Sequence, residues 1–120
     1  MPTVAEFNRM FSLPREPEAV LGPEQFREQA IPRGKRVLIT DVYVENVGPN
    51  PSTLQILEQT GPVSFELRYT FRTPARGVTA LHFRTGLKLG DLLPIRGAIR
   101  IQNGSGGGVL MLPRVNGVIV

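Results

Sequence analysis

Residues 63–72 read VSFELRYTFR, and this stretch decides the fold class. Apolar and polar residues alternate along it, which is the period of a β-strand with one buried face and one exposed face. Antiparallel sheets accept such strands because one of their faces often stays in water. We expect the apolar face to carry Val63, Phe65, Leu67, Tyr69 and Phe71, and the polar face to carry Ser64, Glu66, Arg68, Thr70 and Arg72.

Short strand-like runs separated by Gly and Pro lie on both sides of this stretch. The run at residues 37–47 is rich in β-branched residues, which favour strands. We expect its residues Leu38, Thr40, Val42 and Val44 to share one face. Runs of this length and spacing predict an all-β sandwich or small barrel. The predicted strands are residues 37–47, 52–59, 63–72, 78–85, 95–103, 109–112 and 115–120, with a loop at 86–94.

The composition excludes several classes of protein. The chain has 120 residues, of which 13 are Gly and 11 are Pro, and residues that interrupt helices this often exclude a helical bundle or coiled coil. No apolar stretch approaches the roughly 20 residues of a membrane-spanning helix. Because the sequence has no Cys, a disulfide framework, a thiolate zinc site and a cysteine nucleophile are excluded as well.

The first 35 residues differ from the rest of the chain. Five prolines divide this segment, and two short helical turns are predicted between them, at residues 3–11 and 23–29. Neither turn can bury its apolar face alone, so we expect residues 1–35 to form an N-terminal arm that docks on another surface. That surface is either the arm's own β-sandwich domain, residues 36–120, or a neighbouring subunit.

Arginine dominates the charged residues. Twelve Arg and two Lys stand against ten acidic residues, a formal net charge of +4. We favour a solubilising role that protects sheet edges, ahead of pairing with acidic residues at an interface and of binding nucleic acid. Single-stranded nucleic acid is disfavoured because the aromatic residues are expected in the core. The arginines that alternation places on outward faces are Arg68, Arg72, Arg84, Arg96 and Arg100.

Residues with catalytic or metal-binding chemistry do not form a recognisable site in the sequence. The only histidine, His82, lies on the outward face of its strand without the nucleophile frame that a catalytic histidine needs. Asp41, Tyr43 and Glu45 share one face of the first strand, where we expect them to be solvated or paired with arginines rather than to bind a cation. The glycine-rich run at 103–108 lacks the Lys and the following helix of a phosphate loop. We therefore predict no enzymatic activity, no cofactor and no metal site.

Residues 34–120 resemble a group of viral proteins. The resemblance rests on RVLITDVYVENV at 36–47, on LHFRTGLKLGD at 81–91 and on the terminal NGVIV. This order of segments is similar to that of small jelly-roll proteins of viral particles, especially phage capsid-decoration and fibre-head modules, which commonly form trimers. The resemblance implies a jelly-roll-like antiparallel sandwich that self-associates and docks on a larger particle, in a virion or outside the cell. The first residues contain no signal-peptide pattern.

Self-association of such a protein would bury apolar residues of the arm and of the loop at 86–94. Two other functions stay open. One is a carbohydrate-binding sandwich that uses the face of Asp41, Tyr43 and Glu45 or the arginine surface. The other is an extracellular filament in which the arm completes a neighbour's sheet. The interface candidates are Phe7, Met10, Phe11, Leu87, Leu89, Leu92 and Leu93.

Overall fold

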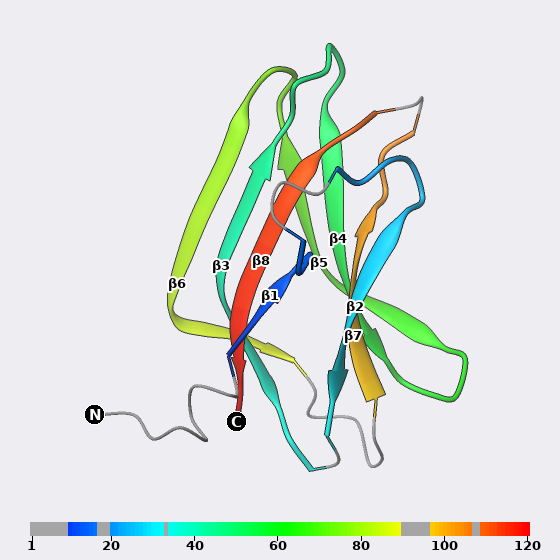
Figure 1. Ribbon diagram of the computed structural model, residues 1–120, viewed down its shortest axis with the longest axis vertical. Helices are drawn as coiled ribbons and strands as arrows, with labels where there is room; N and C mark the ends of the chain where they lie inside the picture. The colour runs from blue at the N-terminus through cyan, green and yellow to red at the C-terminus, as the bar shows by residue number, and fades with distance from the viewer. Residues whose placement is uncertain (1–9, 17–19, 33, 90–96, 107–108) are drawn as a thin grey trace.

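The computed structural model describes residues 10–16, 20–32, 34–89, 97–106 and 109–120 (Figure 1). This part of the chain contains eight strands and no helix, so the prediction of an all-β fold is confirmed. The strands are β1 (Met10–Leu13), β2 (Phe26–Ile31), β3 (Val37–Glu45), β4 (Ser52–Gln59), β5 (Phe65–Thr73), β6 (Val78–Leu89), β7 (Gly97–Asn103) and β8 (Leu112–Ile119).

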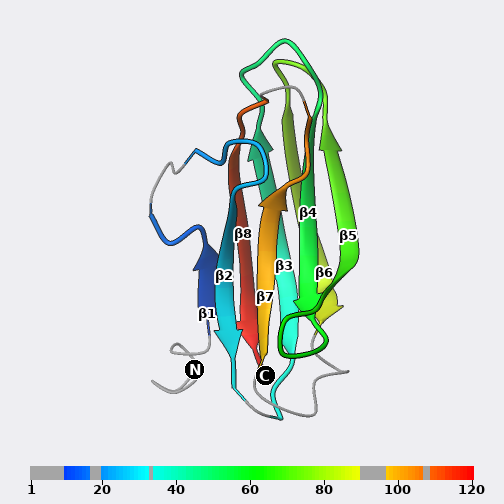
Figure 2. The same cartoon turned by 90° about the vertical axis from the view of Figure 1, so that its right-hand side faces the viewer.

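The strands form two antiparallel sheets of four strands each, which lie face to face as a sandwich (Figure 2). One sheet has the order β1-β8-β3-β6, and the other has the order β2-β7-β4-β5. Each connection except the one from β4 to β5 carries the chain from one sheet to the other. The edge strands β1 and β2 lie together on one side of the sandwich, and β5 and β6 lie together on the other. We call these the β1–β2 side and the β5–β6 side.

The core lies between the two sheets and is built by alternation. In β4, β7 and β8 every second residue is buried, so one face of each strand points to the core. Ile and Leu side chains occupy the middle of these faces in β4 and β7, because such side chains pack well on a pleated surface. The fully buried residues include Leu21, Val37, Ile39, Leu54, Ile56, Ile99, Ile101 and Met111.

A β-bulge changes the faces that alternation predicts in β3. The pairing with both neighbouring strands shifts at Thr40, and the buried positions change from odd to even residue numbers. The prediction that Leu38 and Thr40 share the face of Val42 and Val44 is therefore wrong, because one extra residue reverses the phase of the strand.

A second bulge, at Arg68, has the same effect in β5. The two aromatic residues after the bulge pack against the core, as predicted. Phe65 and Leu67, before it, lie on the outer face of the sheet, and Val63 is exposed just ahead of the strand. The prediction that these three residues face the core is wrong.

The helical turn predicted at 23–29 is also wrong. Phe26–Ile31 forms β2 and pairs with β7, and Met10–Leu13, at the end of the other predicted turn, forms β1 and pairs with β8. Pairing along a free sheet edge satisfies the backbone of each segment, and a helix this short has little stability of its own. The rest of the turn predicted at 3–11 lies outside the described residues. The described strands of the predicted arm thus pair with sheets of the same chain.

β6 is longer than predicted, since it runs on to Leu89 and includes the start of the predicted loop at 86–94. Gly86 lies within it at a φ of 79°, where a Cβ atom would come within 2.9 Å of the Leu38 Cβ. Glycine is suited to this position because it accepts positive φ and close approach. The remainder of that loop, and the first two residues of the strand predicted at 95–103, lie outside the described residues. β8 is one strand and spans the break predicted between 112 and 115.

Candidate interaction surfaces

The apolar interface candidates are distributed between the surface and the core. Met10 is 59% exposed, whereas Phe11 and Leu89 are buried in the core and Leu87 packs against it. Leu87 and Leu89 face inward because β6 continues to this point and pairs with β3. The remaining candidates lie outside the described residues: Phe7, Leu92 and Leu93.

Met10 belongs to an apolar row on the outer face of the sheet β1-β8-β3-β6. It pairs with Val118 of β8, which in turn pairs with Leu38 of β3. Phe11, which follows Met10 in β1, is buried, and so are the residues before and after Val118 in β8 and before and after Leu38 in β3. The row itself therefore points away from the core. An apolar row on the solvent side of a sheet is a candidate contact surface.

The same outer face carries Asp41, Tyr43 and Glu45 on β3. His82 Nδ1 on β6 lies 2.8 Å from Asp41 Oδ1, and Thr40 Oγ1 donates to Asp41 Oδ2 at 2.8 Å. The hydrogen bond with His82, followed by the one from Thr40, lowers the pKa of Asp41 below its ordinary value. Both members of the Asp41–His82 pair are largely exposed, so the pair joins β3 to β6 across the wet surface.

Tyr43 and Glu45 line a shallow pocket of about 240 Å³ beside β8. The basic side chain of this pocket, Arg114, donates from Nη1 to Ser12 Oγ at 2.9 Å and is thereby directed toward β1. Among the described residues, Glu45 forms no ion pair. Pairing of Glu45 with an arginine across the sheet is therefore not found among the described residues, and pairing across a subunit boundary stays a prediction.

Four of the five arginines predicted on outward faces lie among the described residues, on β5, β6 and β7. Arg68, at the bulge, turns toward Glu58, a carboxylate that is only 2% exposed. Arg68 Nε donates to Glu58 Oε2 at 2.9 Å, and Nη2 lies 2.8 Å from the same oxygen without hydrogen-bond alignment. Arg72 on β5 and Arg84 on β6 both belong to the β5–β6 side, whereas Arg100 lies on β7 and Arg96 lies outside the described residues.

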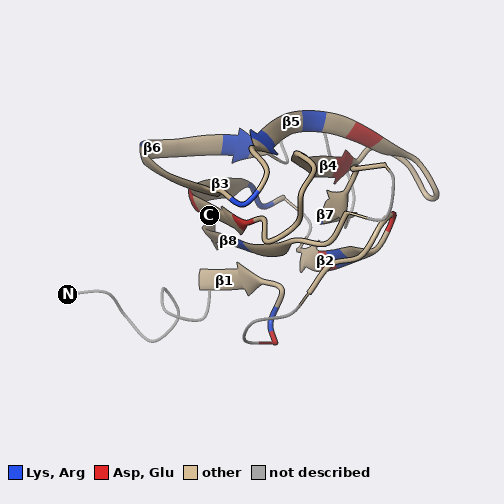
Figure 3. Cartoon of the chain, turned by 90° about the horizontal axis from the view of Figure 1, so that it is seen from above, with Lys and Arg blue, Asp and Glu red and all other residues tan. Residues whose placement is uncertain are grey.

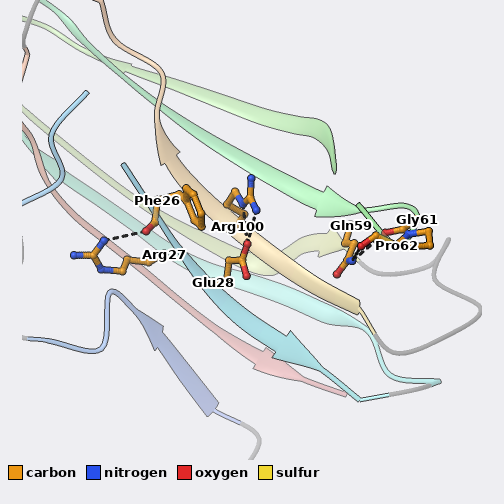
Figure 4. Close-up of polar contacts among 7 residues, drawn as sticks. All are labelled: Phe26, Arg27, Glu28, Gln59, Gly61, Pro62 and Arg100. Carbon is orange, nitrogen blue, oxygen red and sulfur yellow. Dashed lines mark hydrogen bonds and ion pairs between the residues drawn. The ribbon is translucent and has the colours of Figure 1, made fainter. Parts of the chain in front are cut away.

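Arg100 takes part in an aromatic stack on the outer face of the sheet β2-β7-β4-β5 (Figure 4). Its guanidinium carbon lies 3.9 Å from the ring centre of Phe26 and 3.8 Å from that of Phe65. Arg100 Nε and Nη2 donate to Glu28 Oε1 at 2.9 and 2.6 Å. The sequence did not reveal this stack, because the bulge at Arg68 turns Phe65 outward and the segment of Phe26 was predicted to be helical.

The two sheets close incompletely on the β5–β6 side. The rings of Phe71 and Phe83 lie 6.2 Å apart at a tilt of 51°, and both are only partly buried. Thr73 Oγ1 and Thr79 Oγ1, 2.8 Å apart, join the two strands near the turn. Leu81 pairs with a buried residue of β3 and faces the interior, yet it is 41% exposed. We call the apolar strip of Phe71, Leu81 and Phe83 the seam.

Comparison with known proteins adds no relative. No family model matches the chain, and no curated protein matches it. Within the described ranges, no helix has the length and apolar character needed to cross a membrane. The same ranges contain no group of three or more His, Cys, Asp or Glu side chains placed to hold a metal ion. The surfaces described above are therefore the basis for a proposal of function.

Proposed function

We propose that this protein is a non-enzymatic structural module, a jelly-roll-like sandwich that self-associates as a trimer and docks on a larger particle. A jelly roll is supported by the strand order, because the chain crosses between the sheets at every connection but one. A phage capsid or fibre is the kind of particle that the sequence resemblance suggests. This function would place the protein in a virion or outside the cell.

The observation that carries self-association is the apolar row of Met10, Val118 and Leu38. It lies on the outer face of a sheet, where polar residues are expected, and Met10 at its end is largely exposed. Full burial of one such side chain contributes about 1.5–3 kcal/mol before the cost of ordering. A closed symmetric assembly repeats that contact in every subunit. We therefore place the contact between subunits on this row.

Size-exclusion chromatography with light scattering on the full-length protein tests the proposal. We expect the wild type to have the mass of an oligomer and Met10→Asp to have the mass of a monomer. Val47→Asp is the matched control, since Val47 is 60% exposed in the loop after β3, at the opposite end of that strand from Leu38. A monomeric wild type, or equal dissociation by both substitutions, would contradict the proposal.

A second candidate function is carbohydrate binding, which we place on the stack of Phe26, Arg100 and Phe65. An exposed ring beside a fixed carboxylate and guanidinium supplies both a stacking surface and hydrogen-bonding groups for a sugar. A glycan array followed by titration tests this function. Saturable binding that Phe26→Ala abolishes and Tyr43→Ala preserves would support it, and an array without a saturable ligand would reject it.

A further inference from the structure

The formal net charge of the protein is concentrated on the β5–β6 side. Residues 65–89, which comprise β5, the turn and β6, hold five of the 14 basic residues and one of the 10 acidic residues, a net charge of +4. The nine basic and nine acidic residues elsewhere cancel. Figure 3 shows the blue bands of basic residues and the one red band of an acidic residue along β5. The charged residues of this segment are Arg68, Arg72, Arg76, Arg84, Lys88 and Glu66.

Three of these arginines have no partner in the part of the chain that the structure describes. Among the described residues, the guanidinium groups of Arg72, Arg76 and Arg84 form no hydrogen bond or ion pair, and all three residues are exposed. An unpaired cation at a surface is available to a partner of opposite charge. The β1–β2 side differs, because its described arginines have acceptors: Arg15 has Gln29 and Arg27 has Glu16.

The unpaired arginines flank the seam. Arg72 directly follows Phe71 in β5, and Arg84 directly follows Phe83 in β6, so an exposed cation adjoins each ring of the apolar strip. Among the described strands β6 pairs with β3 alone, so none of them is hydrogen-bonded along its other edge. This side therefore offers a strand edge, apolar side chains and cations together.

We propose that the β5–β6 side binds an acidic, amphipathic segment of a partner protein, in an extended conformation along β6. Apolar side chains of the segment would cover Leu81 and the two rings of the seam, while its carboxylates would meet Arg72, Arg76 and Arg84. In an added strand that alternates acidic and apolar residues, one face would turn apolar side chains to the seam and the other would turn carboxylates to the cations beside it. The inference rests on the proposed function for the source of the segment, which is the particle on which the module docks.

Two other occupants fit this surface less well. A second copy would bring two segments of charge +4 together, and like charges at a contact disfavour association. Single-stranded nucleic acid would satisfy the arginines, but Phe71 and Phe83 are turned toward each other and partly buried, so they offer little ring surface to bases. Phosphate groups would also leave the apolar surface of the exposed Leu81 unburied.

Fluorescence anisotropy with three labelled probes tests the inference on the full-length protein. The probes are a 12-residue peptide of alternating Glu and Leu, a peptide of equal charge with alternating Glu and Ser, and a 12-nucleotide single-stranded DNA. We expect the Glu/Leu peptide to bind at least tenfold more tightly than the other two. The double variant Arg72→Gln with Arg84→Gln should weaken that binding at least tenfold. The matched control, Arg15→Gln with Arg27→Gln, removes equal charge on the β1–β2 side and should change it less than twofold.

Leu81→Gln isolates the apolar part of the surface, because it keeps every cation. It should weaken binding of the Glu/Leu peptide and leave the Glu/Ser peptide unchanged. Tightest binding of DNA, equal binding of the two peptides, or equal loss in both double variants would overturn the inference. Light scattering on the same samples separates failure of the docking surface from failure of the proposed function. An oligomer that binds no peptide refutes only the docking surface, whereas a monomer that binds the Glu/Leu peptide refutes only self-association.

Discussion

The β1–β2 side and the β5–β6 side close the same sandwich in different ways. On the β1–β2 side the inward residues Leu13 and Ile31 are each 1% exposed, whereas on the β5–β6 side the inward residue Leu81 is 41% exposed. Charge follows the same division among the described residues, since Arg15 and Arg27 of the first side have partners there and three arginines of the second side do not. A side that satisfies its own side chains serves stability, and a side that leaves them unsatisfied is available for binding.

The largest test of this comparison is a pair of equal truncations. Leu13→Ala removes a fully packed side chain and should lower the free energy of unfolding by about 3–5 kcal/mol. Leu81→Ala removes one that is already partly in water and should cost about 1 kcal/mol. Urea denaturation followed by circular dichroism measures both. Equal losses at the two positions would show that the β5–β6 side is as closed as the other.

The second test concerns the ion pair beneath the β5–β6 side. Glu58→Ala leaves the partly buried Arg68 guanidinium without its main partner and should lower the free energy of unfolding by about 2–4 kcal/mol. Glu66→Ala removes the exposed carboxylate near the same guanidinium and should cost less than about 0.5 kcal/mol. Denaturation of both variants at neutral pH gives the difference. Equal costs would mean that Arg68 is held by its backbone position in the bulge rather than by Glu58.

A third test compares Arg100 of β7, which has partners among the described residues, with Arg72 of the β5–β6 side. Arg100→Ala loses two cation–π contacts and the hydrogen bonds to Glu28, so the free energy of unfolding should fall by about 1–2 kcal/mol. Arg72→Ala removes no contact within the described chain and should stay within about 0.5 kcal/mol of the wild type. Thermal unfolding at two salt concentrations checks the assignment. A larger loss for Arg72 would show that the chain uses it internally, against the docking surface proposed above.

Much of the fold was accessible from the sequence because alternation and turn signals are local. The strand predicted at 52–59 is β4, and the antiparallel sandwich follows from strands of this kind. The two bulges were not accessible, since a bulge is defined by the residue that a neighbouring strand leaves unpaired. β2 was missed for a related reason. A six-residue segment takes its conformation from the free edge of β7, which no local pattern indicates.

The candidate surfaces were less predictable than the fold, because each depends on a pairing between distant segments. Phe26 and Phe65 meet Arg100 only because β2 and β4 flank β7 and the bulge in β5 turns Phe65 outward. The net charge of +4 was plain from the composition. That this charge lies on one side of the sandwich could be recognised only from the topology. β5 and β6 belong to different sheets, and both are edge strands on the same side.

The smallest test concerns the Asp41–His82 pair, which joins the edge strand β6 to β3. Because the pKa of Asp41 is lowered in the folded protein, the pair contributes stability that is fully present above the carboxyl's ordinary pKa of about 3.9. That contribution is lost as pH falls through the lower pKa of the folded state. Asp41→Asn should therefore lower the free energy of unfolding slightly at pH 7. On acidification to pH 3 the variant should lose less stability than the wild type. Urea midpoints at both pH values measure this, with Glu45→Gln as the control that removes a carboxylate of the same face without a histidine partner. An equal acid loss in wild type and Asp41→Asn would mean that the pair does not secure β6, and that this edge strand is held by its backbone ladder alone.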